Sequence, residues 1–166
     1  MSNENDHSVK IQQQIAALEQ NGQFVRNHAY IQHGSISVYE HCVAVANRSC
    51  QIAEALHIHV DMTALIRGAL LHDYFLYDWH EKSADHRLHG FTHPAKALRN
   101  AERDYDLSPL EQNIILRHMF PLVPIPPVCR EAWIVCLADK LCASRETAVG
   151  FYNAVTNRLR LPRPHF

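Results

Sequence analysis

The chain has 166 residues, of which 47% are hydrophobic and 20% are charged, and this composition is typical of a globular protein. The 16 Lys and Arg residues nearly balance the 17 Asp and Glu residues, so the basic field of a general nucleic-acid binder is missing. No apolar run approaches the ~20 residues needed to cross a bilayer. We therefore exclude a disordered tail, a fibre and a disulfide-rich miniprotein, and we expect neither a nucleic-acid nor a membrane partner.

Histidine is unusually frequent, with 13 copies against 16 Lys and Arg residues together. Because imidazole is the commonest metal ligand in proteins, this excess favours metal chemistry before any spacing is considered. The five cysteines form no CxxC pair, and the polar residues 1–10 show no secretory signal. These features predict reduced thiols and a cytoplasmic location.

Apolar periodicity predicts an all-α chain of six or seven helices. A loose apolar stripe over residues 8–20 predicts the first helix, and a stronger stripe over residues 37–57 predicts the second. Asp61 is expected to N-cap a third helix that reaches His72. Residues 74–89 mix aromatic and charged side chains without a period, so we expect a loop there.

The later helices have clearer start signals. Thr92 precedes His93 and Pro94, and proline near a helix start predicts a helix from there to about Tyr105. Ser108 begins a capping-box pattern with proline at the first helical position. Prolines between 121 and 127 end that helix, a long helical pattern follows over about 128–159, and no alternating stretch predicts a strand.

The length makes a single domain over residues 1–166 the default prediction. Within it we expect a core at about 33–148, an N-terminal helical extension at 1–32 and a loose tail at 160–166. A homodimer remains open.

Five polar residues lie in or directly after otherwise apolar helical segments. His41 shares the apolar stripe of the second predicted helix, and His72-Asp73 ends the apolar run of the third. Asp139 follows five apolar residues, and His118 has similarly apolar neighbours. Burying a charged aspartate is costly unless it is paired or bound to a metal. Taken singly, each of these residues also fits a hydrogen-bonded or ion-paired position in the core.

The order His41 … His72-Asp73 … Asp139 resembles the signature of the HD superfamily of metal-dependent phosphohydrolases, H…HD…D on an α-helical core. The flanking sequences match as well, with EHCVAVA at 40–46, ALLHD at 69–73 and ADK at 138–140. This resemblance covers about His33 to Ala148 and implies an HD-type helical bundle.

Two further histidines extend the resemblance to the two-metal branch of the superfamily. His93 and His118 lie between the HD pair and the last aspartate, where that branch places two histidines. The pattern is similar to HD proteins that hydrolyse bis-nucleosyl polyphosphates. It is also similar to HD domains acting on cyclic dinucleotides, although Met119 stands where those often carry another histidine.

The resemblance implies one or two divalent transition metal ions, with Fe, Mn, Co, Ni or Zn as candidates. The implied metal ligands are His41, His72, Asp73, His93, His118 and Asp139. The implied reaction is cleavage of a phosphate ester or anhydride by a metal-activated hydroxide. Asp73 would orient that hydroxide and Lys140 would reach a substrate phosphate, so both are candidate catalytic residues. The expected substrate is a small phosphorylated metabolite, with a nucleotide as the leading candidate.

Four more residues are weaker candidates for substrate binding: His33, Arg117, Arg145 and Trp79. Each of them also fits a structural or surface role. Two other functions remain open, a di-iron HD-type oxygenase and a non-catalytic nucleotide-sensing HD domain. The simplest alternative is a helical bundle with buried histidines and no site.

Overall fold

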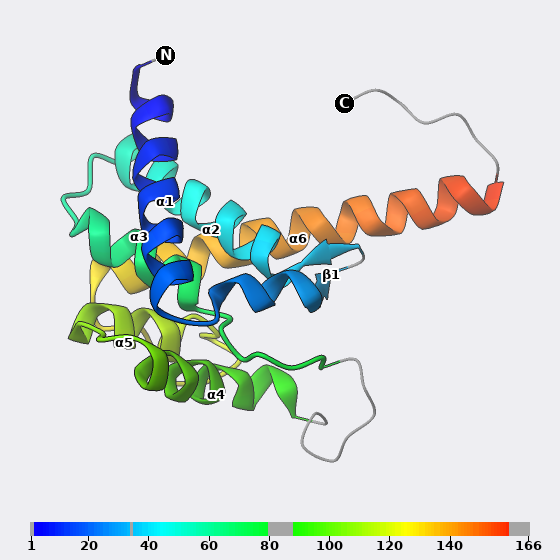
Figure 1. Cartoon of the computed structure of the whole chain (residues 1–166). Helices are drawn as coiled ribbons and strands as arrows, with labels where there is room; N and C mark the ends of the chain where they lie inside the picture. The colour runs from blue at the N-terminus through cyan, green and yellow to red at the C-terminus, as the bar shows by residue number, and fades with distance from the viewer. Residues whose placement is uncertain (1, 34, 80–87, 160–166) are drawn as a thin grey trace.

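A computed structural model describes residues 2–33, 35–79 and 88–159. In chain order the elements are α1 (Ser2–Asn21), the 3-10 helix η1 (Phe24–Ala29), β1 (Ile31–His33), β2 (Ile36–Ser37), α2 (Val38–Ala55), α3 (Met62–Leu71), α4 (His89–Asp104), α5 (Pro109–Arg117) and α6 (Arg130–Leu159). Strands β1 and β2 form a small antiparallel pair. The rest of the described architecture is helical, which confirms the predicted all-α bundle (Figure 1).

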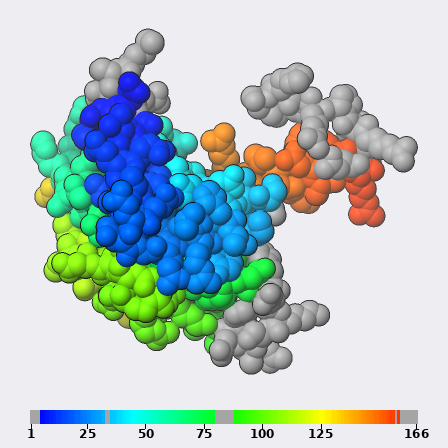
Figure 2. Space-filling view, in the orientation of Figure 1, coloured from blue at the N-terminus to red at the C-terminus, as the bar shows by residue number. Residues whose placement is uncertain are grey.

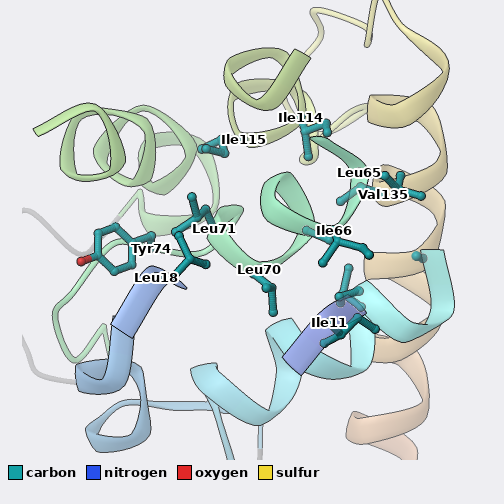
Figure 3. Close-up of a cluster of buried hydrophobic side chains, with 14 of the residues drawn as sticks. Ile11, Leu18, Leu65, Ile66, Leu70, Leu71, Tyr74, Ile114, Ile115 and Val135 are labelled. Carbon is teal, nitrogen blue, oxygen red and sulfur yellow. The ribbon is translucent and has the colours of Figure 1, made fainter. Parts of the chain in front are cut away.

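Helix α3 is the centre of the core. Most of its residues are buried, and Leu65, Leu70 and Leu71 pack among apolar side chains of α1, α5 and α6 (Figure 3). Gly68 lets α5 approach closely, because a Cβ at this position would collide with the side chain of Ile114. The C-terminal end of α3, where the His72-Asp73 pair follows, is therefore fixed from several sides.

Side-chain caps define the starts of three helices. The Asp61 carboxylate accepts a hydrogen bond from the Ala64 amide at 2.9 Å, as predicted. Ser108 and Glu111 form the predicted capping box at α5. A second capping box, formed by Ser37 and Glu40, starts α2. Such caps satisfy backbone amides that the first helical turn leaves without partners.

Helix α4 begins at His89, so the predicted start at Thr92 was wrong. Leu88 is the N-cap and offers no side-chain hydrogen bond, which leaves the true start without a sequence signal. Pro94 consequently lies inside the helix. The β1–β2 pair was missed because strands this short show no alternating pattern.

The ends of the chain can be compared with the predicted N-terminal extension and C-terminal tail. Helix α1 already begins at Ser2, and the predicted tail at 160–166 lies outside the described residues. The C-terminal end of α6 projects away from the rest of the molecule (Figures 1 and 2). No helix in the described ranges is both long and apolar enough to cross a membrane.

Candidate metal centre

Five helices bring six polar side chains to one buried place. His41 comes from α2, His93 from α4 and Asp139 from α6. His72 is the C-cap of α3, with Asp73 directly after it, and His118 is the C-cap of α5. The burial of all six ranges from complete to 8% exposed. The convergence expected from the sequence is therefore present in the fold.

The first cluster consists of His41, His72, Asp73 and Asp139. His41 Nε2 lies 3.2 Å from Asp139 Oδ1 and 3.9 Å from Asp73 Oδ2. His72 Nε2 lies 3.4 Å from Asp73 Oδ2 and 3.7 Å from Asp139 Oδ1. Both imidazole nitrogens thus lie within 4 Å of an oxygen of each carboxylate.

The second cluster consists of Asp73, His93 and His118. Asp73 Oδ1 lies 3.2 Å from His93 Nε2 and 3.5 Å from His118 Nε2. The two Nε2 atoms are 2.8 Å apart. Because Asp73 presents Oδ2 to the first cluster and Oδ1 to the second, its carboxylate joins the two.

Main-chain carbonyls fix the tautomer of three of these histidines. Nδ1 of His72 donates to the Ala69 carbonyl at 2.7 Å, Nδ1 of His93 donates to the His89 carbonyl at 2.8 Å, and Nδ1 of His118 donates to the Ile115 carbonyl at 2.8 Å. Since a carbonyl oxygen only accepts, Nδ1 carries the proton in each ring. In the neutral imidazole, Nε2 then offers a lone pair to the cluster, as metal-ligating histidines commonly do.

Buried atoms without partners show that these residues fit a cation. His72 Nε2 and Asp73 Oδ1 are buried and accept no hydrogen bond within the described residues. In the second cluster, two lone-pair nitrogens and one carboxylate oxygen face one another. A bound divalent metal satisfies such a set of acceptors, whereas burial without a partner is costly. The buried His/Asp groups therefore fit divalent metal binding.

The electrostatics differ strongly between His41 and His118. Burial lowers the pKa of His41, but hydrogen bonds with Asp139 and Glu146 outweigh it and raise this pKa to about 10. Burial and the nearby His72 lower the pKa of His118 to about 3. Burial raises the pKa of Asp73, but the charge of His72 outweighs it and holds this pKa well below its usual range.

Gln32 on β1 holds the shared carboxylate. Its Nε2 donates to Asp73 Oδ2 at 2.5 Å. The Gln32 side chain is buried, and its Oε1 has no hydrogen-bond partner among the described residues. A carboxylate oxygen has two lone-pair sites, so this contact leaves one site of Oδ2 open. The predicted N-terminal extension at 1–32 thus contributes directly to the candidate centre.

A cavity of about 790 Å³ opens onto both clusters. Asp73, His93, His118 and Asp139 form part of its wall. The remaining wall is partly apolar, through side chains that include Met119 and Leu122. This volume lies within the range of small-molecule sites, which combine apolar walls with a few polar groups.

Lys140, the candidate for reaching a phosphate, and Trp79, a candidate for substrate binding, both line this cavity. Lys140 Nζ donates to the His118 carbonyl at 2.8 Å and to the Cys136 carbonyl at 3.3 Å. The Trp79 ring stacks on the His89 ring with centroids 5.0 Å apart.

Two of the other candidates for substrate binding, Arg145 and Arg117, do not line this cavity among the described residues. Arg145 lines a different cavity, between α2 and α6, and Arg117 is absent from the described wall of the 790 Å³ cavity. The side chain of His33 lies outside the described residues.

Two residues at the centre were not predicted, Gln32 and Glu146. Glu146 follows Asp139 by seven residues, or two helical turns, so helical periodicity places it on the same face of α6. That spacing could have identified it. Gln32 lies on a strand too short to leave a pattern, and only its neighbour His33 was a candidate.

Comparison with known proteins gives a single finding. The family model described as HD domain matches residues 38–144, which is more than half of the chain. No curated protein and no solved structure matches significantly. The matched range contains all six clustered side chains, so sequence and geometry agree. The chain belongs to the HD domain family.

Proposed function

We propose that the protein is a metal-dependent phosphohydrolase that cleaves a phosphate ester or anhydride of a nucleotide or another small phosphorylated metabolite. The observation that carries this proposal is the pair of His/Asp clusters joined by Asp73 at the wall of the 790 Å³ cavity. HD domains are typical of such hydrolases.

The ligand assignment follows the two clusters. His41, His72, Asp73 and Asp139 would hold one ion, and Asp73, His93 and His118 would hold a second. Mixed imidazole and carboxylate donors suit Fe, Mn, Co, Ni or Zn. When bound, such ions lower the pKa of water and neutralise charge on a transferring phosphoryl group.

The chain's own groups position the reactants. Asp73, fixed by Gln32, lies at the cavity wall where it can orient an attacking water. Lys140 keeps its ammonium beside the cavity, because two main-chain carbonyls hold it there. A cation in this position would attract the negative charge of a phosphate.

The apolar part of the wall supports a substrate with an organic moiety larger than phosphate. Trp79, Met119 and Leu122 offer a surface against which a nucleobase could pack. The cavity also has room for more than an inorganic ion. A nucleotide would therefore suit both parts of the site, with its phosphate at the clusters and its base against the apolar wall.

The test is phosphate release from a panel of nucleotides and sugar phosphates by protein reconstituted with Mn²⁺, Co²⁺ or Fe²⁺. We expect metal-dependent turnover of at least one compound, and none with the Asp73→Ala variant. Oxygen consumption without phosphate release would instead support the oxygenase alternative. Ligand-dependent stabilisation without turnover would support a nucleotide sensor.

A further inference from the structure

We propose that Glu146 is a positioning residue of the metal centre, which holds the His41 ring so that Nε2 faces the first cluster. This inference rests on the proposed metal binding. Glu146 contacts Nδ1 of His41, and the other ring nitrogen, Nε2, faces the first cluster. The effect of Glu146 on a metal would therefore pass through the imidazole.

The geometry places His41 between two carboxylates of one helix. His41 Nδ1 lies 2.9 Å from Glu146 Oε2, and His41 Nε2 lies 3.2 Å from Asp139 Oδ1. The His41 side chain is completely buried, and that of Glu146 is only 12% exposed. Because the Glu146 carboxylate accepts a hydrogen bond from Nδ1–H, Nε2 of the neutral ring is left with its lone pair directed toward the first cluster.

His41 differs in this respect from the other three histidines of the centre. His72, His93 and His118 each donate to a main-chain carbonyl three or four residues earlier in the chain. Because these acceptors are main-chain carbonyls, a substitution of the side chain at the same residue does not remove them. Nδ1 of His41 instead contacts a side-chain carboxylate, that of Glu146. A charged acceptor also makes the imidazole a stronger electron-pair donor to a metal.

Glu146 also lines a second cavity, of about 430 Å³, between α2 and α6. None of the described residues lines both this cavity and the one at the clusters. A small carboxylate could therefore reach the position of a removed Glu146 side chain without entering the substrate cavity. This feature permits a rescue experiment.

The experiment titrates metal-free protein with Co²⁺ alone and follows its visible absorption. Four proteins are compared: wild type, Glu146→Gln, Glu146→Ala and the control Glu102→Gln, which changes the same charge at an exposed position of α4. Glutamine keeps an acceptor oxygen but loses the charge. Alanine removes both.

We expect one of the Co²⁺ equivalents to bind about 10-fold more weakly in Glu146→Gln and up to about 100-fold more weakly in Glu146→Ala. The control should match wild type. Added formate should restore Co²⁺ affinity in Glu146→Ala and leave Glu146→Gln unchanged, because the glutamine side chain still fills the space.

Unchanged Co²⁺ affinity in a folded Glu146→Gln and Glu146→Ala, with normal binding by wild type, would show that Glu146 has no positioning role. Weakened binding that formate does not restore in Glu146→Ala would also overturn the proposal in favour of a purely structural role. If Glu146→Ala does not fold, Glu146→Gln alone decides. Failure of wild type to bind Co²⁺ would overturn the metal centre itself, and the proposed function with it.

Discussion

The two clusters share Asp73 but differ in charge and in support. The first cluster contains two carboxylates, and one of its imidazoles is held by the Glu146 side chain. The second contains only the shared carboxylate, and both of its imidazoles are held by main-chain carbonyls. More negative charge favours a divalent cation, so we expect the two sites to differ in affinity, with the first one tighter.

The metal-free states of the clusters differ as well. His41 has a pKa raised to about 10, whereas His118 has a pKa lowered to about 3. Burial lowers the pKa of His72, but the Asp73 charge outweighs it and raises this pKa well above its usual range. At neutral pH, protons on His41 and His72 therefore occupy the first cluster, while His118 in the second is neutral. A metal must displace these protons before it can bind there.

The largest effect is expected from Asp73, the one residue common to both clusters. Asp73→Ala should abolish binding of both metals and lower kcat/KM by more than about 100-fold, which exceeds the usual cost of losing an outer partner of a metal ligand. Metal content and phosphate release measure this. A folded Asp73→Ala protein that retains two metals would contradict the shared-ligand assignment.

Single-cluster variants should separate the two sites. Asp139→Asn should lose the metal of the first cluster, and His93→Gln should lose that of the second, because each removes a ligand of one cluster only. Elemental analysis should then give about one metal per chain in each variant against two in wild type. Identical loss of both metals in both variants would show that the clusters do not bind independently.

Metal removal should lower the stability of the whole domain. A ligand present at roughly 1000 times its dissociation constant stabilises the folded state by about 4 kcal/mol, which corresponds to a change in Tm of about 10 °C for a chain of this size. Differential scanning calorimetry with and without a chelator measures the change. Restoration by Mn²⁺ or Co²⁺ but not by Ca²⁺ is the expected control result, since Ca²⁺ prefers oxygen ligands.

The pH dependence of metal binding should differ between the clusters. Below the His41 pKa of about 10, a rise in pH removes competing protons from His41 and from His72, whose pKa is also raised. Affinity at the first cluster should therefore increase with pH, by up to about tenfold per pH unit for each proton released. His118 gives no such dependence at neutral pH, because its pKa of about 3 leaves it neutral.

Calorimetric titrations in buffers with different enthalpies of ionisation measure the protons released on binding. The His93→Gln variant isolates the first cluster, because it loses a ligand of the second. If this variant released no proton on binding a metal, the proposed difference between His41 and His118 would be contradicted.

The smallest effects concern charges beyond the clusters. Lys140→Gln should raise KM by about tenfold, since a hydrogen bond to a charged group contributes about 1.5 kcal/mol. Arg145→Gln should leave KM nearly unchanged, because Arg145 faces the other cavity. Steady-state kinetics of the two variants test this. A larger rise in KM for Arg145→Gln than for Lys140→Gln would place the substrate in the cavity between α2 and α6 and contradict the proposed site.

The features that the sequence predicted correctly are each marked by residues that are close together in the chain. The caps at Asp61 and Ser108 lie directly before periodic helices. The six clustered side chains lie on periodic helices or directly after them. The resemblance to HD proteins supplied their grouping, because periodicity places a residue on a helix face and does not say which faces meet.

The missed features depend on contacts between distant segments. Gln32 reaches Asp73 across 41 positions from a three-residue strand, and such a contact leaves no trace in local composition. Arg145 was a weaker candidate for substrate binding, and it lies six residues after Asp139. A displacement of six residues on a helix turns its side chain toward another face, which is where the structure has it.

The most direct test of the account is anomalous diffraction, at the metal absorption edge, from crystals of protein reconstituted with Mn²⁺ or Co²⁺. The account predicts two peaks, one among His41, His72, Asp73 and Asp139 and the other among Asp73, His93 and His118, with Asp73 in contact with both. A map without a peak at these side chains, or with its peaks at sites that exclude Asp73, would contradict it.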